Sequence, residues 1–273
     1  MPANEFLSPR PRPEIAEHEF IATENQSPIA QVSYDRMRFR FTTAKKVHFR
    51  AVSFKYCVFE DCYFRDCRFE DCDFTGATFR NSVLRGSMFD GSRFDYCRFA
   101  HSLVPVVILE RHMPGYENVA LELARALRVN YAQVGDSDGV NRAISAELSA
   151  TRTHLEKVAW SNEGYYRNKH RGFERAIKVL EYYWFYVLDF VWGHGESLPK
   201  LLRTLILAYM VLVVFLYRSS GGFFPAIQDA FLLIWSNYGG APQIPMAAAV
   251  TLALRTLLLG LFVAVLVRRL SRR

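Results

Sequence analysis

The sequence lacks the even set of cysteines and the apolar leader that are typical of a secreted disulfide scaffold. It has five cysteines in 273 residues, and an odd number cannot pair completely within one chain. The first 30 residues contain five prolines and no apolar core. We therefore expect no signal peptide there, and thiols that stay reduced.

Sequence signatures of common catalytic sites are also lacking. The chain has no G-x-G-x-x-G, P-loop, H-E-x-x-H or G-x-S-x-G motif. Its seven histidines do not show the spacing of a metal-ligand set,. The sequence therefore argues against an enzyme, and we expect no metal and no bound cofactor.

Charged residues are few, at 22%, whereas hydrophobic residues make up 51%. This balance excludes a disordered chain and a coiled-coil rod, and the length allows one or two domains. The net charge of +7 indicates an acidic partner such as a membrane surface or a nucleic acid,. Arginines 268, 269, 272 and 273 directly follow an apolar run, which favours the lipid bilayer and argues against nucleic acid.

The first half of the chain is organised by a period of five residues. Large apolar residues recur at this spacing, a small residue lies two positions before each, and most other positions are polar. The large residues are Phe49, Phe54, Phe59, Phe64, Phe69, Phe74, Phe79, Leu84, Phe89, Phe94 and Phe99. Neither the helix period of 3.6 nor the strand period of 2 gives this pattern.

This pattern resembles the pentapeptide-repeat family. The resemblance implies a right-handed quadrilateral β-helix over residues 32–106, with the large residues as its core and one side for every five residues. Twelve beats from Val47 to Val104 then give about three coils, and Tyr34 and Phe39 are in phase for a weaker one before them. Residues 1–31 are expected to form a disordered, proline-rich tail. The rigid β-helix is expected to bind an unidentified cytoplasmic ligand or protein.

Four of the cysteines follow one another at intervals of five residues, as C-x4-C-x4-C-x4-C over residues 57–72. Zinc sites usually contain C-x2–4-C pairs, often with histidine. Each of these cysteines takes the place that Ala77 and Ser82 take in other repeats, which favours inert, buried thiols. Residues 45–104 carry ten basic and eight acidic residues, so the β-helix lacks the acidity that DNA mimicry requires.

Residues 107–196 are expected to form a helical connector. Apolar spacing predicts a helical hairpin over residues 114–160, with a turn at residues 135–139,. Asp136, Asp138 and Glu147 match three positions of a calcium loop, but Val140 and Asn141 break that pattern, so we interpret the turn as a helix cap. A further helix over residues 172–192 is rich in tyrosine and tryptophan. It suits the headgroup layer of a membrane, and an ordinary aromatic-rich soluble helix is the alternative.

Residues 197–273 contain two apolar runs, 198–217 and 246–267, of 20 and 22 residues. Each is long enough to cross a bilayer, and the alternative is a buried hairpin of a soluble domain. The run 223–235 between them is too short to cross and suits a re-entrant helix. Basic residues flank the entry of the first run and the end of the second. The chain is therefore expected to cross the cell's inner (plasma) membrane twice, with both termini cytoplasmic.

The order of span, short helix, Tyr-Gly turn and span resembles the two-transmembrane pore domain of potassium channels. The resemblance implies a homotetramer around a pore that holds a monovalent ion, with Gly260 as a hinge of the inner helix. The residues aligned with the selectivity filter T-V-G-Y-G-D are Trp235, Ser236, Asn237, Tyr238, Gly239 and Gly240.

The filter departs from the potassium-channel pattern. Trp235 has no hydroxyl group for the innermost ion site, Asn237 stands where the family has glycine, and Arg255 lies in the middle of the second span. An intramembrane arginine normally has a partner or faces a cavity, and Asp229 is the nearest acid. Two functions follow: a membrane ion channel, with non-selective and anion-permeable conduction both open, and a non-conducting, membrane-anchored pentapeptide-repeat scaffold.

Overall fold

The computed structural model describes residues 12–21, 27–169, 172–218, 220–235, 255–257 and 259–267. The chain divides into two compact units, Met1–Lys169 and His170–Arg273. The boundary lies within the connector that the sequence predicts over residues 107–196. The first part of that connector therefore belongs to the β-helix unit, and the rest belongs to the apolar C-terminal unit.

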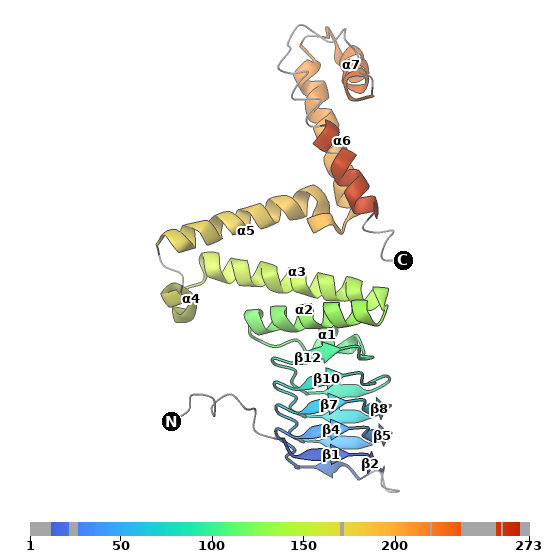
Figure 1. The fold of residues 1–273 in the computed structure, drawn as a ribbon. Helices are drawn as coiled ribbons and strands as arrows, with labels where there is room; N and C mark the ends of the chain where they lie inside the picture. The colour runs from blue at the N-terminus through green and yellow to red at the C-terminus, as the bar shows by residue number, and fades with distance from the viewer. Residues whose placement is uncertain are drawn as a thin grey trace, which may run out of the picture. The chain divides into compact units, whose positions relative to one another are not determined.

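The first unit is built on a four-sided β-helix (Figure 1). Three sides are parallel sheets in the orders β1-β4-β7-β10-β12, β11-β9-β6-β3 and β2-β5-β8. Bridges that link Ser33, Ser53, Asp73 and Arg93 make the fourth side. The strands are β1 Glu14–Ala16, β2 Glu19–Phe20, β3 Ile29–Ala30, β4 Arg38–Arg40, β5 Thr43–Lys45, β6 His48–Arg50, β7 Val58–Glu60, β8 Tyr63–Arg65, β9 Arg68–Glu70, β10 Thr78–Arg80, β11 Met88–Asp90 and β12 Arg98–Ala100.

Each coil contains 20 residues, so identical repeat positions stack on one another. Phe39 pairs with Phe59, and Phe79 pairs with Phe99, in the parallel register of one side. Their rings stack nearly parallel, with centroids 5.0 and 5.3 Å apart. All eleven large residues that the sequence places in the core are buried. The continuous column of rings is the core that a single coil cannot bury alone.

The β-helix begins earlier than the sequence predicts. The prediction of a disordered tail up to residue 31 is wrong from Glu14 onward, because β1, β2 and β3 form a first coil. Ile15 pairs with Phe39 and Phe20 with Ala44, 24 residues apart, whereas Ile29 pairs with Phe49 at the usual 20. Four extra residues between β2 and β3 thus break the repeat. The β-helix has about four turns, where the sequence predicts about three and a weaker one before them.

Every corner of the β-helix is a residue with left-handed backbone. Two positions after each inward residue, φ is positive in fifteen successive repeats from Gln31 to His101. Glycine takes three of these corners, and at Gly76 a Cβ atom would lie 2.5 Å from the ring of Tyr56. Asp61, Asp66, Asp71 and Asn81 take four others; Asn and Asp are the side chains that tolerate this region best after glycine.

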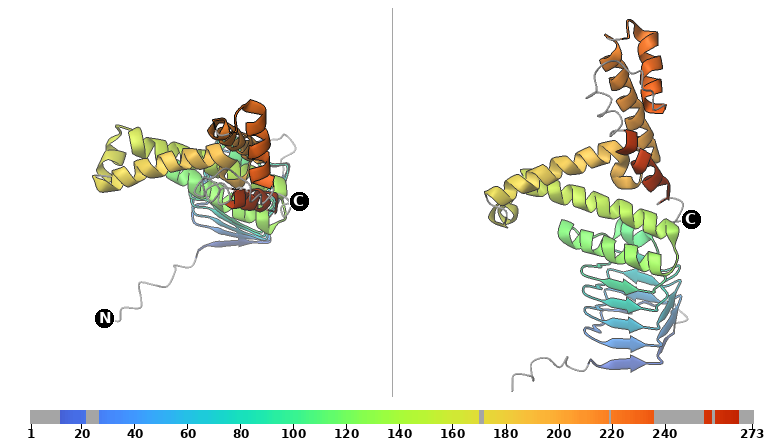
Figure 2. Two further views of the ribbon diagram at one scale, coloured as in Figure 1. Left: turned by 90° about the horizontal axis from the view of Figure 1, so that it is seen from above. Right: turned by 45° about the horizontal axis from the view of Figure 1, so that its top comes forward.

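Helices close the end of the β-helix, and in Figure 2 two of them run side by side there. The helices of this unit are α1 Val107–Arg111, α2 Glu117–Gln133, α3 Ser137–Trp160 and α4 Gly164–Lys169. Leu123 and Leu127 of α2 pack into the same core as the phenylalanines. The predicted hairpin is confirmed, and the Asp136 carboxylate accepts a bond from the Gly139 amide at 2.9 Å as the cap of α3.

The second unit contains the helices α5 Phe173–Trp192, α6 Leu198–Leu216 and α7 Phe223–Trp235, with a short 3-10 turn η1 Gly193–Gly195 between α5 and α6. The predicted helix over 172–192, the first apolar run and the short run 223–235 are confirmed as helices. In the second run, 246–267, the described residues 255–257 and 259–267 are helical.

Candidate functional site

The helix α6 is the part of the described chain that is long and apolar enough to cross a membrane. It has 19 residues, a mean hydropathy of 1.9, and only 11% of its apolar stretch is buried within the molecule. Ile206, Val211 and Val214 are 63 to 72% exposed. A core helix of a soluble domain is mostly buried, whereas the described residues leave most of the apolar surface of α6 exposed,.

The start of α6 is fixed by its sequence. The Ser197 hydroxyl accepts a bond from the Lys200 amide at 3.4 Å, and Pro199 lies in the first turn. Serine at the cap and proline in the first turn are favoured because the first amides of a helix have no internal partner. The helix therefore begins at a capped residue, directly where the apolar run begins.

The short helix α7 folds back and packs against α6. Ala226 and Ala230 of α7 are fully buried against Val213 and Leu216 of α6. The Tyr209 hydroxyl donates to the carbonyl oxygen of Ile227 at 2.9 Å. Small residues let two helices approach closely, and a tyrosine bonded to backbone fixes their register. This pair gives a 13-residue apolar helix shielded on one face by a membrane-length helix.

Asp229 and Arg255 are the two charged residues that the sequence singles out in the proposed membrane part of the second unit. The Ser220 hydroxyl donates to Asp229 on α7 at 2.6 Å. Arg255 is half-buried in the helical segment that contains Gly260, and a Cβ at Gly260 would meet no atom within 4 Å. The pairing of Asp229 with Arg255 that the sequence predicts is not tested by these contacts and stays a prediction.

Five of the six predicted filter residues lie outside the described residues. Trp235 is the last residue of α7, whereas Ser236, Asn237, Tyr238, Gly239 and Gly240 fall in the undescribed stretch 236–254. The structure therefore fixes the helix that leads into the aligned filter, and the alignment of the filter itself stays a prediction.

The helix α5 carries a broad apolar face that is exposed among the described residues of its own unit. Large apolar residues of this face are exposed: Phe173, Ile177, Leu180, Tyr183, Trp184, Val187 and Phe190 are 43 to 81% exposed. On a helical wheel these positions share one face, and Arg175, Lys178 and Asp189 lie on the other,. An aromatic face opposite a charged one is typical of a helix that lies in the membrane interface.

A polar junction connects α5 to the first turns of α6. The Lys200 ammonium lies 2.7 Å from an Asp189 carboxylate oxygen, and the Thr204 hydroxyl donates to the Val191 carbonyl oxygen at 2.7 Å. The Arg203 guanidinium lies over the Phe190 ring, 4.2 Å from its centroid. Three successive residues with positive φ, from Gly193 to Gly195, turn the chain between the helices. The junction thereby fixes α5 to the end of the membrane-length helix.

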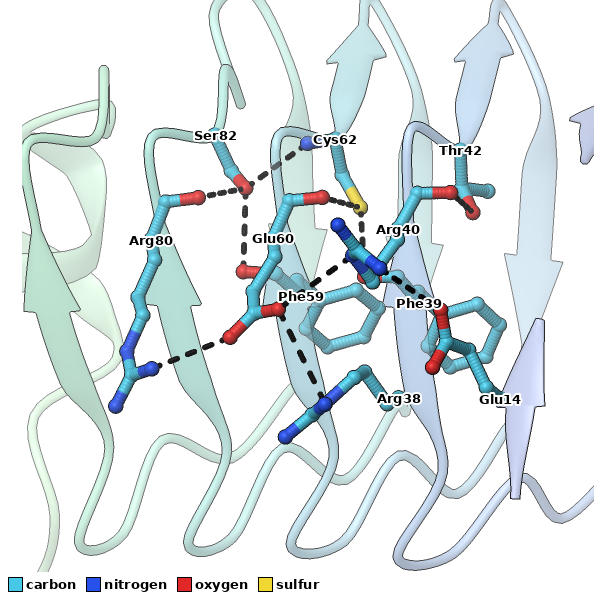
Figure 3. Close-up of polar contacts among 10 residues, drawn as sticks. All are labelled: Glu14, Arg38, Phe39, Arg40, Thr42, Phe59, Glu60, Cys62, Arg80 and Ser82. Carbon is cyan, nitrogen blue, oxygen red and sulfur yellow. Dashed lines mark hydrogen bonds and ion pairs between the residues drawn. The ribbon is translucent and has the colours of Figure 1, made fainter. Parts of the chain in front are cut away.

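Inside the β-helix, the small residues form a ladder of hydrogen bonds. The Cys62 thiol donates to the Phe39 carbonyl of the previous coil at 3.4 Å, and the Ser82 hydroxyl accepts from the Cys62 amide at 3.2 Å (Figure 3). Burial raises the pKa of Cys62, Cys67 and Cys72 to about 11. Among the described residues no group of His, Cys, Asp or Glu could hold a metal ion. The four thiols of the pattern are buried small side chains of the β-helix core.

Charged residues on the outside of the β-helix compensate one another from coil to coil. Glu60 lies 3.2 Å from Arg80 on one neighbouring strand and 3.8 Å from Arg40 on the other, and Arg40 reaches Glu14 at 3.3 Å (Figure 3). Most of these side chains are exposed, so each pair contributes little to stability. Their effect is a surface with no concentrated charge of either sign along this side.

Sequence reasoning misses the residue that ends the ladder. Asn130 of α2 is fully buried; its side-chain oxygen accepts from the Ser102 amide at 2.9 Å, and its side-chain nitrogen donates to the Ser102 carbonyl at 2.8 Å. These two bonds replace those that a further coil would make. The available signal is an amide side chain on the otherwise apolar face of Leu123, Leu127 and Tyr131.

Comparisons with known proteins identify the repeats. Family models described as pentapeptide repeats match residues 34–78 and 67–102, so the chain contains a pentapeptide-repeat domain. Neither match extends beyond residue 102. No curated protein matched the chain.

Two solved structures illustrate the similarity. QnrB1, a plasmid-mediated fluoroquinolone resistance protein, is 13% identical over 33% of this chain, with a TM-score of 0.12, and the match covers 61% of its own chain. A pentapeptide repeat protein from the Arabidopsis thaliana thylakoid lumen is 14% identical over 46% of this chain and 86% of its own, with a TM-score of 0.18.

Proposed function

We propose that the protein is a membrane ion channel, assembled as a homotetramer, that carries its pentapeptide-repeat domain on the cytoplasmic side. The observation that supports this function is the pair α6 and α7. A membrane-length apolar helix is followed by an apolar helix of 13 residues that folds back on it. A helix too short to cross a bilayer is tolerated at membrane depth where protein shields it or it borders a cavity.

The proposed assembly is supported by the small number of spans in one chain. Two spans cannot enclose a pore, whereas a closed ring of identical chains can. The exposed faces of α6 supply surface both for lipid and for neighbouring copies. The aromatic face of α5 is proposed to lie in the headgroup layer, because α5 is fixed to the first turns of α6 through Asp189 and Lys200,.

A non-conducting membrane scaffold is the second candidate. Four of the six residues aligned with the filter T-V-G-Y-G-D differ from it. The same membrane helices would then anchor the β-helix without passing ions. Conduction is the property that separates the two functions.

The test is reconstitution of the full chain into liposomes that hold a potassium, sodium or chloride gradient. The channel predicts flux of at least one ion by oligomers whose mass is verified. Gly239→Val in the aligned filter is expected to abolish the flux. Gly115→Val is the matched control, since a Cβ at Gly115 would meet no atom within 4 Å, and it is expected to conduct normally. An intact oligomer that passes no ion favours the scaffold.

A further inference from the structure

One side of the β-helix differs from the other three in its surface charges. On those three sides, basic residues pair with acidic residues of the neighbouring coil at 3.2 to 3.3 Å, as Arg80 does with Glu60, Arg68 with Asp90 and Lys55 with Asp73. The fourth side contains β5 and β8 (Figure 1). Among the described residues, this β5–β8 side has no ion pair between coils, so its charges are not compensated in the same way.

A column of three basic side chains runs along the β5–β8 side. Lys45 is in register with Arg65, and the Asp66 amide donates to the Arg85 carbonyl oxygen at 3.2 Å, which places Arg85 on the next coil. Neighbouring strands lie about 4.8 Å apart, so three exposed cations recur at this interval. Of the three side chains, Arg65 alone has polar contacts in the described part of the chain, with the Asp66 carboxylate at 3.5 Å and the Tyr63 hydroxyl at 3.4 Å.

An apolar column lies beside the basic one. Tyr63, Val83 and Leu103 are linked by parallel bridges from coil to coil, and Tyr63 and Val83 stand two positions before Arg65 and Arg85. Residues two positions apart in a strand point to the same face, so both columns face outward. Tyr63 is 37% and Leu103 is 41% exposed. The β5–β8 side thus offers positive charge and apolar contact along two parallel lines.

Acidic residues in these three coils lie at the corners of the β5–β8 side. Asp61 and Asp66 occupy corners, and so does the additional cation Lys46. Four basic residues exceed two acidic ones over residues 41–46, 61–66 and 81–86. In the first coil, Glu19 of β2 ends the basic stretch. The positive strip is therefore three coils long and measures about 10 Å from its first cation to its last.

We propose that the β5–β8 side is a docking surface for an acidic, amphipathic α-helix of a protein partner. A helix rises about 1.5 Å per residue, so carboxylates three or four residues apart are separated by about 5–6 Å along it, close to the interval of the three cations. Apolar residues on the adjoining stripe of such a helix match the column of Val83 and Leu103. The inference is independent of ion conduction and assigns a role to the pentapeptide-repeat domain.

The apolar column favours a protein over a nucleic acid as the partner. Phosphates also complement a row of cations, but proteins that bind single strands combine a basic groove with aromatic side chains on which successive bases stack. In this column Tyr63 is aromatic, whereas Val83 and Leu103 are aliphatic. Aliphatic side chains match the leucines of an amphipathic helix.

The experiment measures binding of a fluorescent synthetic peptide to the full-length protein in a nonionic detergent, by fluorescence anisotropy. The peptide is a helix of about 20 residues, with glutamates on one stripe and leucines on the next. Lys45→Glu combined with Arg85→Glu is expected to weaken binding about tenfold or more. Arg93→Glu combined with Arg98→Glu is the matched control, because it reverses two exposed cations on other sides of the β-helix, and it is expected to bind as the wild type does.

A second pair of variants tests the apolar column. Leu103→Ser is expected to weaken binding of the peptide, whereas Met88→Ser, at a residue 58% exposed on another side, is expected to leave it unchanged. A peptide with serine in place of every leucine is expected to bind the wild type more weakly. Circular dichroism of each variant verifies that the β-helix is intact.

Three results overturn the inference. The first is a wild-type protein that does not bind the acidic helix, and the second is an equal loss of affinity in the two double variants. The third is a single-stranded oligothymidine that binds more tightly than the peptide and displaces it, which would assign the β5–β8 side to nucleic acid. None of these results concerns ion flux, so the docking surface and the channel function fail separately.

Discussion

The two units of the chain bury their apolar residues in opposite ways. In the β-helix, Phe59, Phe69 and Phe79 are at most 2% exposed, and each lies between rings of the neighbouring coils. In the second unit, residues of similar size such as Trp184 and Ile206 are more than 60% exposed. The first unit completes its core from one chain. Among the described residues, the second unit leaves much of its apolar surface exposed.

This difference agrees with the separate roles that the proposed function gives to the two units. A repeat fold with a closed core is a rigid support. In the proposed channel, lipid and further copies of the chain cover the apolar helices of the second unit. The predictions below test whether the buried residues of the first unit stabilise its fold and whether the exposed apolar residues of the second unit contact the membrane.

The largest effect is expected in the phenylalanine column. Phe69→Ala removes a ring stacked between Phe49 and Phe89, at 5.0 and 5.1 Å, and is expected to destabilise the β-helix by about 3–5 kcal/mol. Urea unfolding followed by circular dichroism measures the loss. Tyr63→Ala, at a partly exposed site on the outside, is the control. Equal losses for the two variants would contradict a column that carries the fold.

A charge placed on an exposed apolar residue should weaken membrane association when the residue lies in the second unit, and should have no effect when it lies on the β-helix. Ile206→Arg lies near the centre of α6 and is expected to cost roughly 2.5–3.5 kcal/mol of membrane insertion. Met88→Arg, at a residue 58% exposed on the β-helix, should change neither folding nor membrane association. Flotation with liposomes measures both variants. If Ile206→Arg floats as well as the wild type, α6 is not in the bilayer.

The next test concerns the contact between the last coil of the β-helix and Asn130 of α2. Asn130→Leu leaves the amide and carbonyl of Ser102 buried without partners and is expected to cost about 1–3 kcal/mol for each group. Gln133→Leu, which removes a bond to the His101 amide in an exposed position, should cost much less. Thermal unfolding of both variants gives the comparison, and a stable Asn130→Leu protein would show that the ladder needs no cap.

How much of this could be predicted depends on whether a feature repeats. The five-residue spacing predicts the coils because every coil uses the same inward position. The spacing does not predict the first coil, because four extra residues between Phe20 and Ile29 shift the phase of the repeat. Ile15 and Phe20 are themselves five residues apart. The role of Asn130 is not predictable in the same way, because a single amide side chain in a helix belongs to no repeating pattern. Helix α7 was predictable in full from its apolar run.

The corners of the β-helix offer a smaller effect. Gly91 has φ of +65°, and a Cβ there would meet the carboxylate of Asp71. Gly91→Ala is therefore expected to cost about 1–2 kcal/mol. Gly115→Ala, which has open space around it, is the matched control in thermal unfolding. No difference between the two variants would mean that left-handed corners carry no strain.

The smallest effect concerns acid stability. His48, 2.9 Å from Glu70, holds the pKa of that carboxyl below its ordinary value. A lowered pKa in the folded state stabilises the protein above the ordinary value near 4.5, and this gain is lost as the pH falls through the lowered pKa,. Glu70→Gln should flatten the decline of the melting temperature between pH 6 and pH 3. If the melting temperature of Glu70→Gln declines as steeply as that of the wild type, Glu70 does not contribute to the acid sensitivity.

The most direct test of the account is protease protection of the full chain in liposomes, read by mass spectrometry of the surviving peptides. The account predicts that trypsin leaves Arg218 and Arg255 uncut within a lipid-held fragment, or cuts only at Arg218 from the far side, while the β-helix is released as a folded, soluble piece. Recovery of the intact chain as a soluble monomer without detergent would contradict the account. Trypsin cleavage at Arg255 in the liposome sample would contradict it as well.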